Sequence, residues 1–421
     1  LGNDRIISKE AGIKIFFDTD SIYHSNLQFK YINSERKLQL YRDINGVSGA
    51  PMLNTYHNIT MDFELLEWNI DKDIIRFGSL PGPSQSRIKF ESVNRYLQQK
   101  YDSMQGIDAI HPLFLVNNYV KTKKEEKFFV RDFAKFSRFP VVQIQHLLIQ
   151  LANDGFIFYD NAEQRITVLP KLNNYIEAAS GLDDCDYDVI IFNSIINRVS
   201  KNNFNADLNI NNKDLKVFGI SGINLSDSND VFLIPDYGEL VIKKNRNFIF
   251  NGQIEAGNGR LKLLGRNFLF DYDEFKIDLK QIDLIQLSVL VNDQYGNEYL
   301  TPVKTQFEAK SGDLRIDHPT NKSGLRKEEF LNFPIFRSFE SSYAYYDDIL
   351  DGVYDRSRFS FHIDPFTIDS VDTFSSKGLL FPGSFESAGI FPVFDDTLRW
   401  QDDNSLGFTR KTPKDGFAIY G

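Results

Sequence analysis

Apolar and polar residues alternate along much of this chain, and no other feature of the sequence constrains the fold as strongly. The pattern is clearest in NFIFNGQIEAGNGRLKLLGRNFLFDYDEFKIDL (residues 247–279), where an NF-aromatic-turn motif occurs twice, twenty residues apart. Side chains two positions apart lie on the same face of a β-strand, so the alternation predicts consecutive strands that bury one face. The aromatic residues expected on that buried face are Phe248, Phe250, Phe268, Phe270 and Tyr272.

The motif is limited to two copies, and the composition agrees with a sheet. A solenoid needs at least three repeats to bury a continuous core, so we expect a meander or sandwich and not a regular β-helix. The chain contains 38 Phe and 19 Tyr but only 2 Trp and 3 Met, and Phe and Tyr suit half-buried pleated surfaces. The sequence therefore predicts a mainly β protein built from antiparallel, sandwich-like sheets.

The sequence divides into three regions, and 421 residues suffice for two or three domains that each bury a core. Residues 1–80 contain short alternating segments and predict an N-terminal β region, which the run SLPGPSQS (residues 79–86) ends. Residues 87–180 have helical spacing, and residues 183–421 return to strands. Because the chain starts without Met and stops abruptly, we expect a segment of a longer polypeptide in which the last region continues.

The middle region is predicted to hold most of the helix. FESVNRYLQQKY predicts one helix, with Phe90 and Leu97 on its apolar stripe. HPLFLVNNYV predicts a helix that begins at His111, and VVQIQHLLIQLANDG predicts another that stops at Gly155. FIFYDNAEQRITVLP predicts a hairpin that turns at residues 161–164. The order helix, helix, hairpin resembles a winged-helix module, so the β regions are expected to flank a small winged-helix-like α+β module.

Such a module raises the question of DNA binding, which the charge pattern disfavours. A recognition helix needs Arg, Lys or Asn side chains on its exposed face, yet no Arg or Lys occurs between Pro140 and Gly155. The positions expected to be exposed are Gln143, Gln145, His146, Gln150 and Asn153. The nearby basic residues are Lys121, Lys123, Lys124, Lys127, Arg131, Lys135 and Arg138. Glu125 and Glu126 interrupt them and the net charge is −10, so we expect no nucleic-acid partner.

Several long stretches of the third region resemble a family of very large cell-envelope proteins of the Bacteroidota. They are DYDVIIFNS, NADLNINNKDLKVFGI, LSDSNDVFLIPD, KKNRNFIFNGQIEAG, GDLRIDHPTNKSG, GVYDRSRFSFHIDPF and SAGIFPVFDDTLRWQDDNSLGFTRKTPKDGFAIYG, which span most of residues 186–421. The resemblance implies an exported protein, located in the periplasm or at the outer surface, with other envelope proteins as partners. The family has no established activity, so the resemblance assigns no catalytic residue.

Calcium is the one cofactor for which the sequence offers candidate ligands. DLNINNKDLKVF begins like an EF-hand loop, but Asn212 and Phe218 stand where Gly and Glu are required. Looser oxygen ligands remain in SDSND and DYDE, and they are Asp227, Asp230, Asp271 and Asp273. The alternative is turn chemistry, because Asp, Asn and Ser side chains bond to their own backbone in turns.

No set of residues predicts a particular reaction. The six histidines are dispersed, Cys185 lies in the acidic context DDCDYD, and no P-loop, GxGxxG or GxSxG is present. Acidic pairs occur at Asp183–Asp184, Asp347–Asp348 and Asp395–Asp396, and Trp68 and Trp400 are the residues suited to stack on sugars.

The sequence therefore assigns no catalytic and no cofactor-binding residue, and no apolar run reaches the roughly 18 residues of a membrane span. The function expected is that of a non-catalytic structural or interaction scaffold in assembly, transport or adhesion. The alternative is a surface protein that binds or degrades glycans. A Trp-flanked acidic cleft would favour the alternative, and broad sheets with exposed edges would favour the scaffold.

Overall fold

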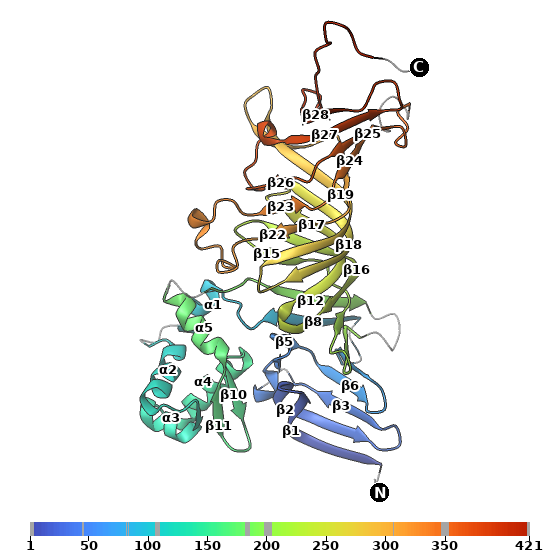
Figure 1. Cartoon of the computed structure of the whole chain (residues 1–421). Helices are drawn as coiled ribbons and strands as arrows, with labels where there is room; N and C mark the ends of the chain where they lie inside the picture. The colour runs from blue at the N-terminus through green and yellow to red at the C-terminus, as the bar shows by residue number, and fades with distance from the viewer. Residues whose placement is uncertain are drawn as a thin grey trace. The chain divides into compact units, whose positions relative to one another are not determined.

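The fold is mainly β, as predicted, and its sheets are antiparallel (Figure 1). The computed structural model describes residues 4–43, 46–80, 82, 84–105, 110–181, 186–197, 204–305, 307–346 and 353–418. Contacts divide the chain into two compact units, the first formed by Leu1–Ile223 with Tyr237–Phe248 and the second by Asn224–Asp236 with Ile249–Gly421. The predicted division into three domains stays a prediction.

The first unit is a sheet that branches at a long strand. Its strands are β1 Arg5–Phe17, β2 Asp20–Ile32, β3 Lys37–Tyr41, β4 Met52–Asn54, β5 Ile59–Asp62, β6 Leu65–Asn69, β7 Ile74–Gly78, β8 Gln85–Ser92, β12 Ile191–Asn197, β13 Ala206–Asn209 and β14 Leu215–Val217. One edge of β2 pairs with β1, and its other edge pairs with β4 near its start and with β3 near its end. One branch continues through β6, β7, β13 and β14, and the other through β5, β8 and β12.

Both branches bury apolar side chains, and a buried amide connects them. Leu40 and Phe77 lie in the β3 branch, and Met61 and Ile88 lie in the β4 branch, all almost fully buried. Asn205 precedes β13, and its backbone N–H donates to the Phe77 carbonyl. The Asn205 side-chain amide donates to the carbonyl oxygens of residues 86 and 194, at 3.1 and 3.2 Å, in the other branch. The predicted sandwich-like arrangement is therefore held together by polar as well as apolar contacts.

The second unit repeats the branching at β19. Its strands are β17 Phe248–Ala256, β18 Leu261–Asp271, β19 Lys276–Asn292, β20 Glu298–Pro302, β21 Phe307–Ala309, β22 Gly312–Arg315, β23 Ile335–Ser338, β24 Ser342–Tyr345, β25 Phe359–Ile363, β26 Thr367–Ile368, β27 Leu380–Ser387, β28 Phe394–Trp400 and β29 Leu406–Gly407. Strands β15 Ile223–Ser226 and β16 Val231–Ile242 contribute residues to both units, and Phe248, the first residue of β17, belongs to the first unit. One edge of β19 pairs with β18, and the other pairs in turn with β22, β21 and β20.

Four phenylalanine rings fill the space between the two branches of the second unit. Phe307 and Phe381 belong to the branch that β21 starts, whereas Phe336 belongs to β23 in the branch that β22 starts. Phe366 lies among them, with its ring centroid 4.9 to 5.8 Å from each of the other three. The two branches therefore pack through aromatic rings, as expected for a composition rich in Phe.

A glycine permits the irregular pairing between β18 and β19. The register shifts between Leu264 and Gly265. A Cβ atom at Gly265 would lie 2.1 Å from the Gln281 carbonyl oxygen, closer than any side chain tolerates. Only glycine fits at this close approach of two backbones.

The α-helices of the described chain gather in one module of the first unit. They are α1 Gln98–Gln105, α2 Pro112–Lys123, α3 Val130–Ser137, α4 Val141–Asn153 and α5 Pro170–Ala179. The module also contains a three-stranded sheet, formed by β9 Lys127–Phe129, β10 Ile157–Asp160 and β11 Arg165–Val168. We call residues 96–187 the helical module. The His111 side chain caps α2, and Gly155, at φ 78°, follows α4 as predicted. The hairpin β10–β11 is also confirmed.

The prediction of one helix across FESVNRYLQQKY (residues 90–101) is wrong. The first residues of this stretch form strand β8, which pairs on both edges with β5 and β12, and Phe90 stacks on Phe192 at 5.1 Å. Strand pairing on both edges overrides a helix-like spacing of apolar residues. The helix α1 begins only at Gln98. Beyond the order of its helices and hairpin, the resemblance of the module to a winged helix stays a prediction.

The chain leaves the sheet and returns to it at one place. Arg95 and Asp188 form a parallel bridge, and the Tyr96 N–H donates to the Asp188 carbonyl at 3.2 Å. The Asp188 carboxylate is fully buried and accepts from the Ser92 hydroxyl at 2.6 Å and from the Ile190 N–H at 2.9 Å. The helical module is thus an excursion with a closed base.

The aromatic residues of the repeated motif are buried, as the alternation predicts. Phe250 on β17 and Phe268 on β18 meet edge to face, with ring centroids 5.6 Å apart. Phe248, Phe270 and Tyr272 are also buried. The period of two therefore identified core residues correctly.

We predict that Phe268→Ala lowers the free energy of unfolding by about 3–5 kcal/mol, because it removes a fully buried ring and leaves a cavity. Urea unfolding of the wild type and the variant measures the change. Tyr299→Ala is the matched control, since Tyr299 is about half exposed on β20. Equal stability of Phe268→Ala and the wild type would contradict a core role for the motif.

Candidate functional site

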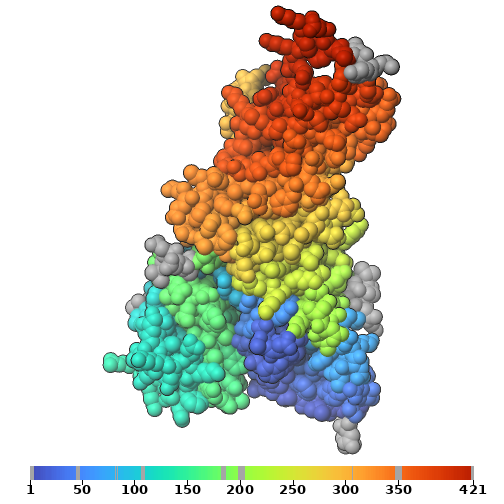
Figure 2. Space-filling view, in the orientation of Figure 1, coloured from blue at the N-terminus to red at the C-terminus, as the bar shows by residue number. Residues whose placement is uncertain are grey.

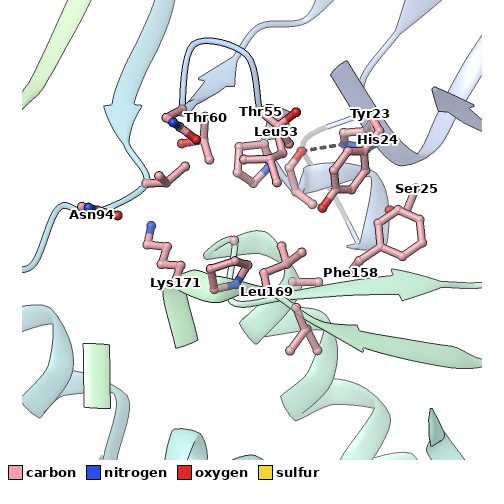
Figure 3. Close-up of a pocket in the computed structure, with 18 of the residues that line it drawn as sticks. Tyr23, His24, Ser25, Leu53, Thr55, Thr60, Asn94, Phe158, Leu169 and Lys171 are labelled. Carbon is pink, nitrogen blue, oxygen red and sulfur yellow. Dashed lines mark hydrogen bonds between the residues drawn. The ribbon is translucent and has the colours of Figure 1, made fainter. Parts of the chain in front are cut away.

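A pocket lies within the first unit, between its N-terminal strands and the helical module (Figure 3). In Figure 2 these two parts, blue and cyan to green, touch each other. The pocket has a volume of about 380 Å³. Its walls include Tyr23 and Leu53 from the strands and Ile157 and Phe158 from the module. Its size falls in the usual range of small-molecule sites.

Aromatic and aliphatic side chains make most of the pocket wall. The rings of Tyr23 and Phe158 meet edge to face at 5.5 Å across the boundary between strands and module. Tyr23, His24 and Ser25 come from β2, Leu53 comes from β4, and Phe158 comes from β10. Burial raises the pKa of Tyr23 above its ordinary value, so its hydroxyl stays protonated.

A buried ion pair lies behind the pocket. Lys171, at the start of α5, lines the pocket, and its Nζ donates to the Glu91 carboxylate on β8 at 2.8 Å. Both side chains are about 95% buried. Lys89 and Arg95 lie 3.5 and 3.8 Å from the same carboxylate. One acid thus faces three cations, and the pair links the helical module to the sheet.

The surroundings of this pair favour the ionised form of the Glu91 carboxylate. Burial alone would raise the pKa of Glu91, but Lys171, Lys89 and Arg95 together lower it to about 2. Burial lowers the pKa of Lys171, and the facing Glu91 opposes that change. Breaking one partner of such a pair leaves a buried charge without compensation, which is costly.

Two histidines of the first unit are buried in the neutral form. The His24 Nε2 donates to the Ala50 carbonyl at 2.6 Å, and its Nδ1 accepts from the Asn26 N–H at 3.1 Å. His57 lies 2.9 Å from the Lys213 carbonyl. Burial lowers the pKa of each imidazole to about 4. His24 borders the pocket, but its ring nitrogens already have backbone partners, so it serves structure here.

A second hollow lies on the surface of the helical module. We call it the α4 groove, and its walls include Ile110, Phe139, Gln143, Val142, Leu147 and Gln150. Val142 is 77% exposed and Phe139 is 45% exposed. The helix starts directly after Pro140, and the residues of its first turn, Val141, Val142 and Gln143, are exposed.

The face of α4 differs in part from the prediction. Ile144, Leu148 and Leu151 are buried, whereas Val141 is 45% exposed. Gln143, His146 and Gln150 are exposed as predicted, whereas Gln145 and Asn153 are half-buried. Gln145 is held inward because its amide donates to the Gln164 side chain at 2.8 Å. The exposed face of α4 is therefore more apolar than its sequence suggested.

The basic residues near α4 are exposed but lie on other elements. Lys121 and Lys123 end α2, Lys127 lies on β9, and Arg131 and Lys135 lie on α3. Helix α4 itself contains no Asp, Glu, Lys or Arg. The structure brings no cation onto the helix that would enter a DNA groove.

The calcium candidates lie in turns. Asp271 accepts from the backbone N–H groups of Asp273 and Glu274 at 3.0 and 3.1 Å, as an Asx turn requires. Asp227 accepts from the Asn224 side chain, and Asp230 has a left-handed backbone. Among the described residues no group of three His, Cys, Asp or Glu side chains is placed to hold a metal. Calcium binding stays a prediction.

The remaining candidate residues do not converge on a site. The Trp68 indole donates to the Lys72 carbonyl at 2.9 Å, and Trp400 pairs with Leu406 in a ladder. Asp396 faces Arg410 at 3.6 Å, and its neighbour Asp395 is exposed. The other predicted acidic pairs and the cysteine, Asp183, Asp184, Asp347, Asp348 and Cys185, lie outside the described residues.

No protein-family model, curated protein or solved structure matches the chain. Among the described helices, none combines the length and the apolar character that a membrane span requires.

Sequence reasoning missed the pocket and its ion pair. Glu91 and Lys171 are 80 residues apart, and neither belongs to a motif. The one local signal is Pro170, which starts a helix and places Lys171 in its first turn, where a cation is unfavourable. A cation at this unfavourable position indicates an acidic partner elsewhere in the chain, but the sequence does not show which residue it is.

We predict that the first unit loses stability as the pH falls from about 6.5 toward 4. In this window the unfolded chain protonates His24 and His57, whereas the folded protein keeps them neutral, so proton binding favours unfolding. Each histidine should lower the free energy of unfolding by roughly 2 kcal/mol at pH 5 relative to pH 7. Urea unfolding at both pH values measures this. His24→Gln should remove about half of the change, and the exposed-site control His146→Gln should remove none.

We also predict that the helical module binds no nucleic acid. DNA binders neutralise several phosphates and lose affinity steeply with salt, and α4 offers no cation to hold a duplex in register. Duplex and single-strand binding at low salt, followed by a salt titration, measures this. Micromolar binding that is lost when Lys123, Lys124 and Lys127 are changed to Glu would refute the prediction.

Proposed function

We propose that this chain is a non-catalytic scaffold of the bacterial cell envelope, exported to the periplasm or the outer surface, that makes contacts with other envelope proteins. The resemblance of residues 186–421 to large envelope proteins of the Bacteroidota supports the setting. A large antiparallel sheet that branches in both units and includes long strands suits a structural role.

The observation that carries the proposal is the α4 groove. Exposed apolar residues rimmed by polar ones mark protein interaction sites. Val142 is 77% exposed and Ile110 is 55% exposed, and both line the groove with Phe139. Leaving these side chains in water has an unfavourable free energy that a protein contact would remove.

The chemistry of the groove defines the partner surface. Helix α4 carries no Asp, Glu, Lys or Arg, and the rim residues Gln143 and Gln150 are uncharged. A partner segment with apolar side chains between uncharged polar ones complements this surface, because neither side would bury an unpaired charge. We therefore expect a segment of another envelope protein in the groove.

We predict that Val142→Glu lowers the amount of a bound partner by about tenfold, because a carboxylate would be buried in the contact. The full-length protein is purified from its native envelope as the wild type, as Val142→Glu and as Lys135→Glu, and the co-purifying proteins are quantified. A partner retained by Lys135→Glu but lost by Val142→Glu, and photo-crosslinked from position 142, is the expected result.

Three results would each contradict the proposal. One is an identical set of co-purifying proteins in all three samples, with no crosslink from position 142. Another is hydrolysis of an envelope polysaccharide by the purified protein, which would favour a glycan-degrading function. Recovery of the protein from the cytosol would refute the envelope location.

A further inference from the structure

The pocket between the N-terminal strands and the helical module has the size of a site for a small organic molecule. A cavity of about 150 Å³ in a protein core is large enough for benzene, and this pocket measures about 380 Å³. It therefore accommodates roughly a dozen non-hydrogen atoms. The pocket is separate from the α4 groove, so its role does not depend on the proposed protein contact.

The wall of the pocket favours an apolar body. Leu53 and Val93 line it from the sheet side, and Ile157, Phe158 and Leu169 line it from the module. Figure 3 shows Leu53, Phe158 and Leu169 gathered around the same space. Moving an alkyl chain from water to such a surface is favourable by about 0.8 kcal/mol for each CH₂ group.

Most polar groups of the wall already have partners in the protein. His24 uses both ring nitrogens. The Asn58 amide donates to Asn245 at 2.8 Å, and the Thr55 hydroxyl accepts from the Ser21 N–H at 2.8 Å. A sugar would bring many hydroxyl groups that need partners, so the wall selects against a polyhydroxy ligand.

The charges at the pocket favour an anion. Lys171 and Arg246 both line it and are 5% and 8% exposed, and none of the described lining residues is acidic. The Lys171 ammonium has three donor hydrogens; one points to Glu91, and the ammonium can donate to a second acceptor as well. Lys89 and Arg95 also face Glu91, at 3.5 and 3.8 Å, so Lys171 is not the only cation that compensates this carboxylate.

We propose that this pocket binds an amphiphile with one anionic head group and an apolar body of roughly ten carbon atoms. The head group lies against Lys171 and Arg246, and the body lies against the apolar wall. An alkyl carboxylate is the simplest molecule of this class. A cationic amphiphile would place a like charge beside two buried cations, which costs free energy.

Calorimetric titration with three matched probes tests the proposal. The probes are decanoate, 1-decanol and decyltrimethylammonium at equal ionic strength. We expect decanoate to bind about tenfold or more tightly than 1-decanol, as a charged hydrogen bond implies, and the cation not to bind. Equal affinity for decanoate and 1-decanol would refute the role of the cations. Failure of all three to bind the folded protein would refute the site.

Variants separate the two parts of the site. Leu53→Trp should fill the pocket and abolish binding of decanoate and 1-decanol, whereas Ile74→Trp, at a partly exposed position outside the pocket, should not. Arg246→Gln should weaken decanoate about tenfold and leave 1-decanol unchanged, and Lys72→Gln is the exposed control. Unchanged decanoate binding by Leu53→Trp or Arg246→Gln would contradict the proposal.

A further variant addresses Lys171 without leaving a lone buried charge. Lys171→Met combined with Glu91→Gln removes both members of the pair and should weaken decanoate while sparing 1-decanol. Thermal melting confirms which variants are folded. If this variant does not fold, Arg246→Gln alone decides whether the head group meets a cation.

Discussion

The pairing of one long strand with several short ones is the constraint on which both units depend. A strand with alternating residues buries only one face, and the sheet needs a second layer to cover it. In this chain both layers start from one long strand, because different strands pair with successive parts of it. Strands β2 and β19 each have one partner along one edge and successive partners along the other. The strand pairing therefore divides into two branches in each unit. Phe366 and its neighbours then fill the space between the branches of the second unit.

The sequence was informative wherever structure is local. The period of two identified Phe250 and Phe268 as core, and capping and turn residues located α2, the end of α4 and the β10–β11 hairpin. It failed at β8, whose residues read as a helix, because the partner strand β12 lies about a hundred positions further along. The exposed first turn of α4 was also missed, since helical spacing shows which residues share a face but not where the core ends.

The pocket could not have been found from the sequence either, because the residues that form it are far apart along the chain. Its wall combines side chains of β2, β4, β10 and α5, and its charge depends on a carboxylate on β8. A buried ion pair such as Glu91–Lys171 contributes little net stability, because its desolvation offsets its attraction. It does restrict how the helical module rests on the strands, since any other arrangement would separate the two charges. The same pair therefore holds Lys171 at the wall of the pocket.

The closed base of the helical module has a consequence for folding. Strand β12 must find β8 across more than ninety residues, and closing a flexible loop of that length costs about 4 kcal/mol in chain entropy. The module carries its own core, including Phe133, Leu148 and Phe156, and the Arg95–Asp188 bridge brings its two ends together. Once the module has collapsed, the ends are neighbours and the remaining search is short. A long insertion of this kind thus acts as a preformed turn, and the sheet can form around it at little entropic cost.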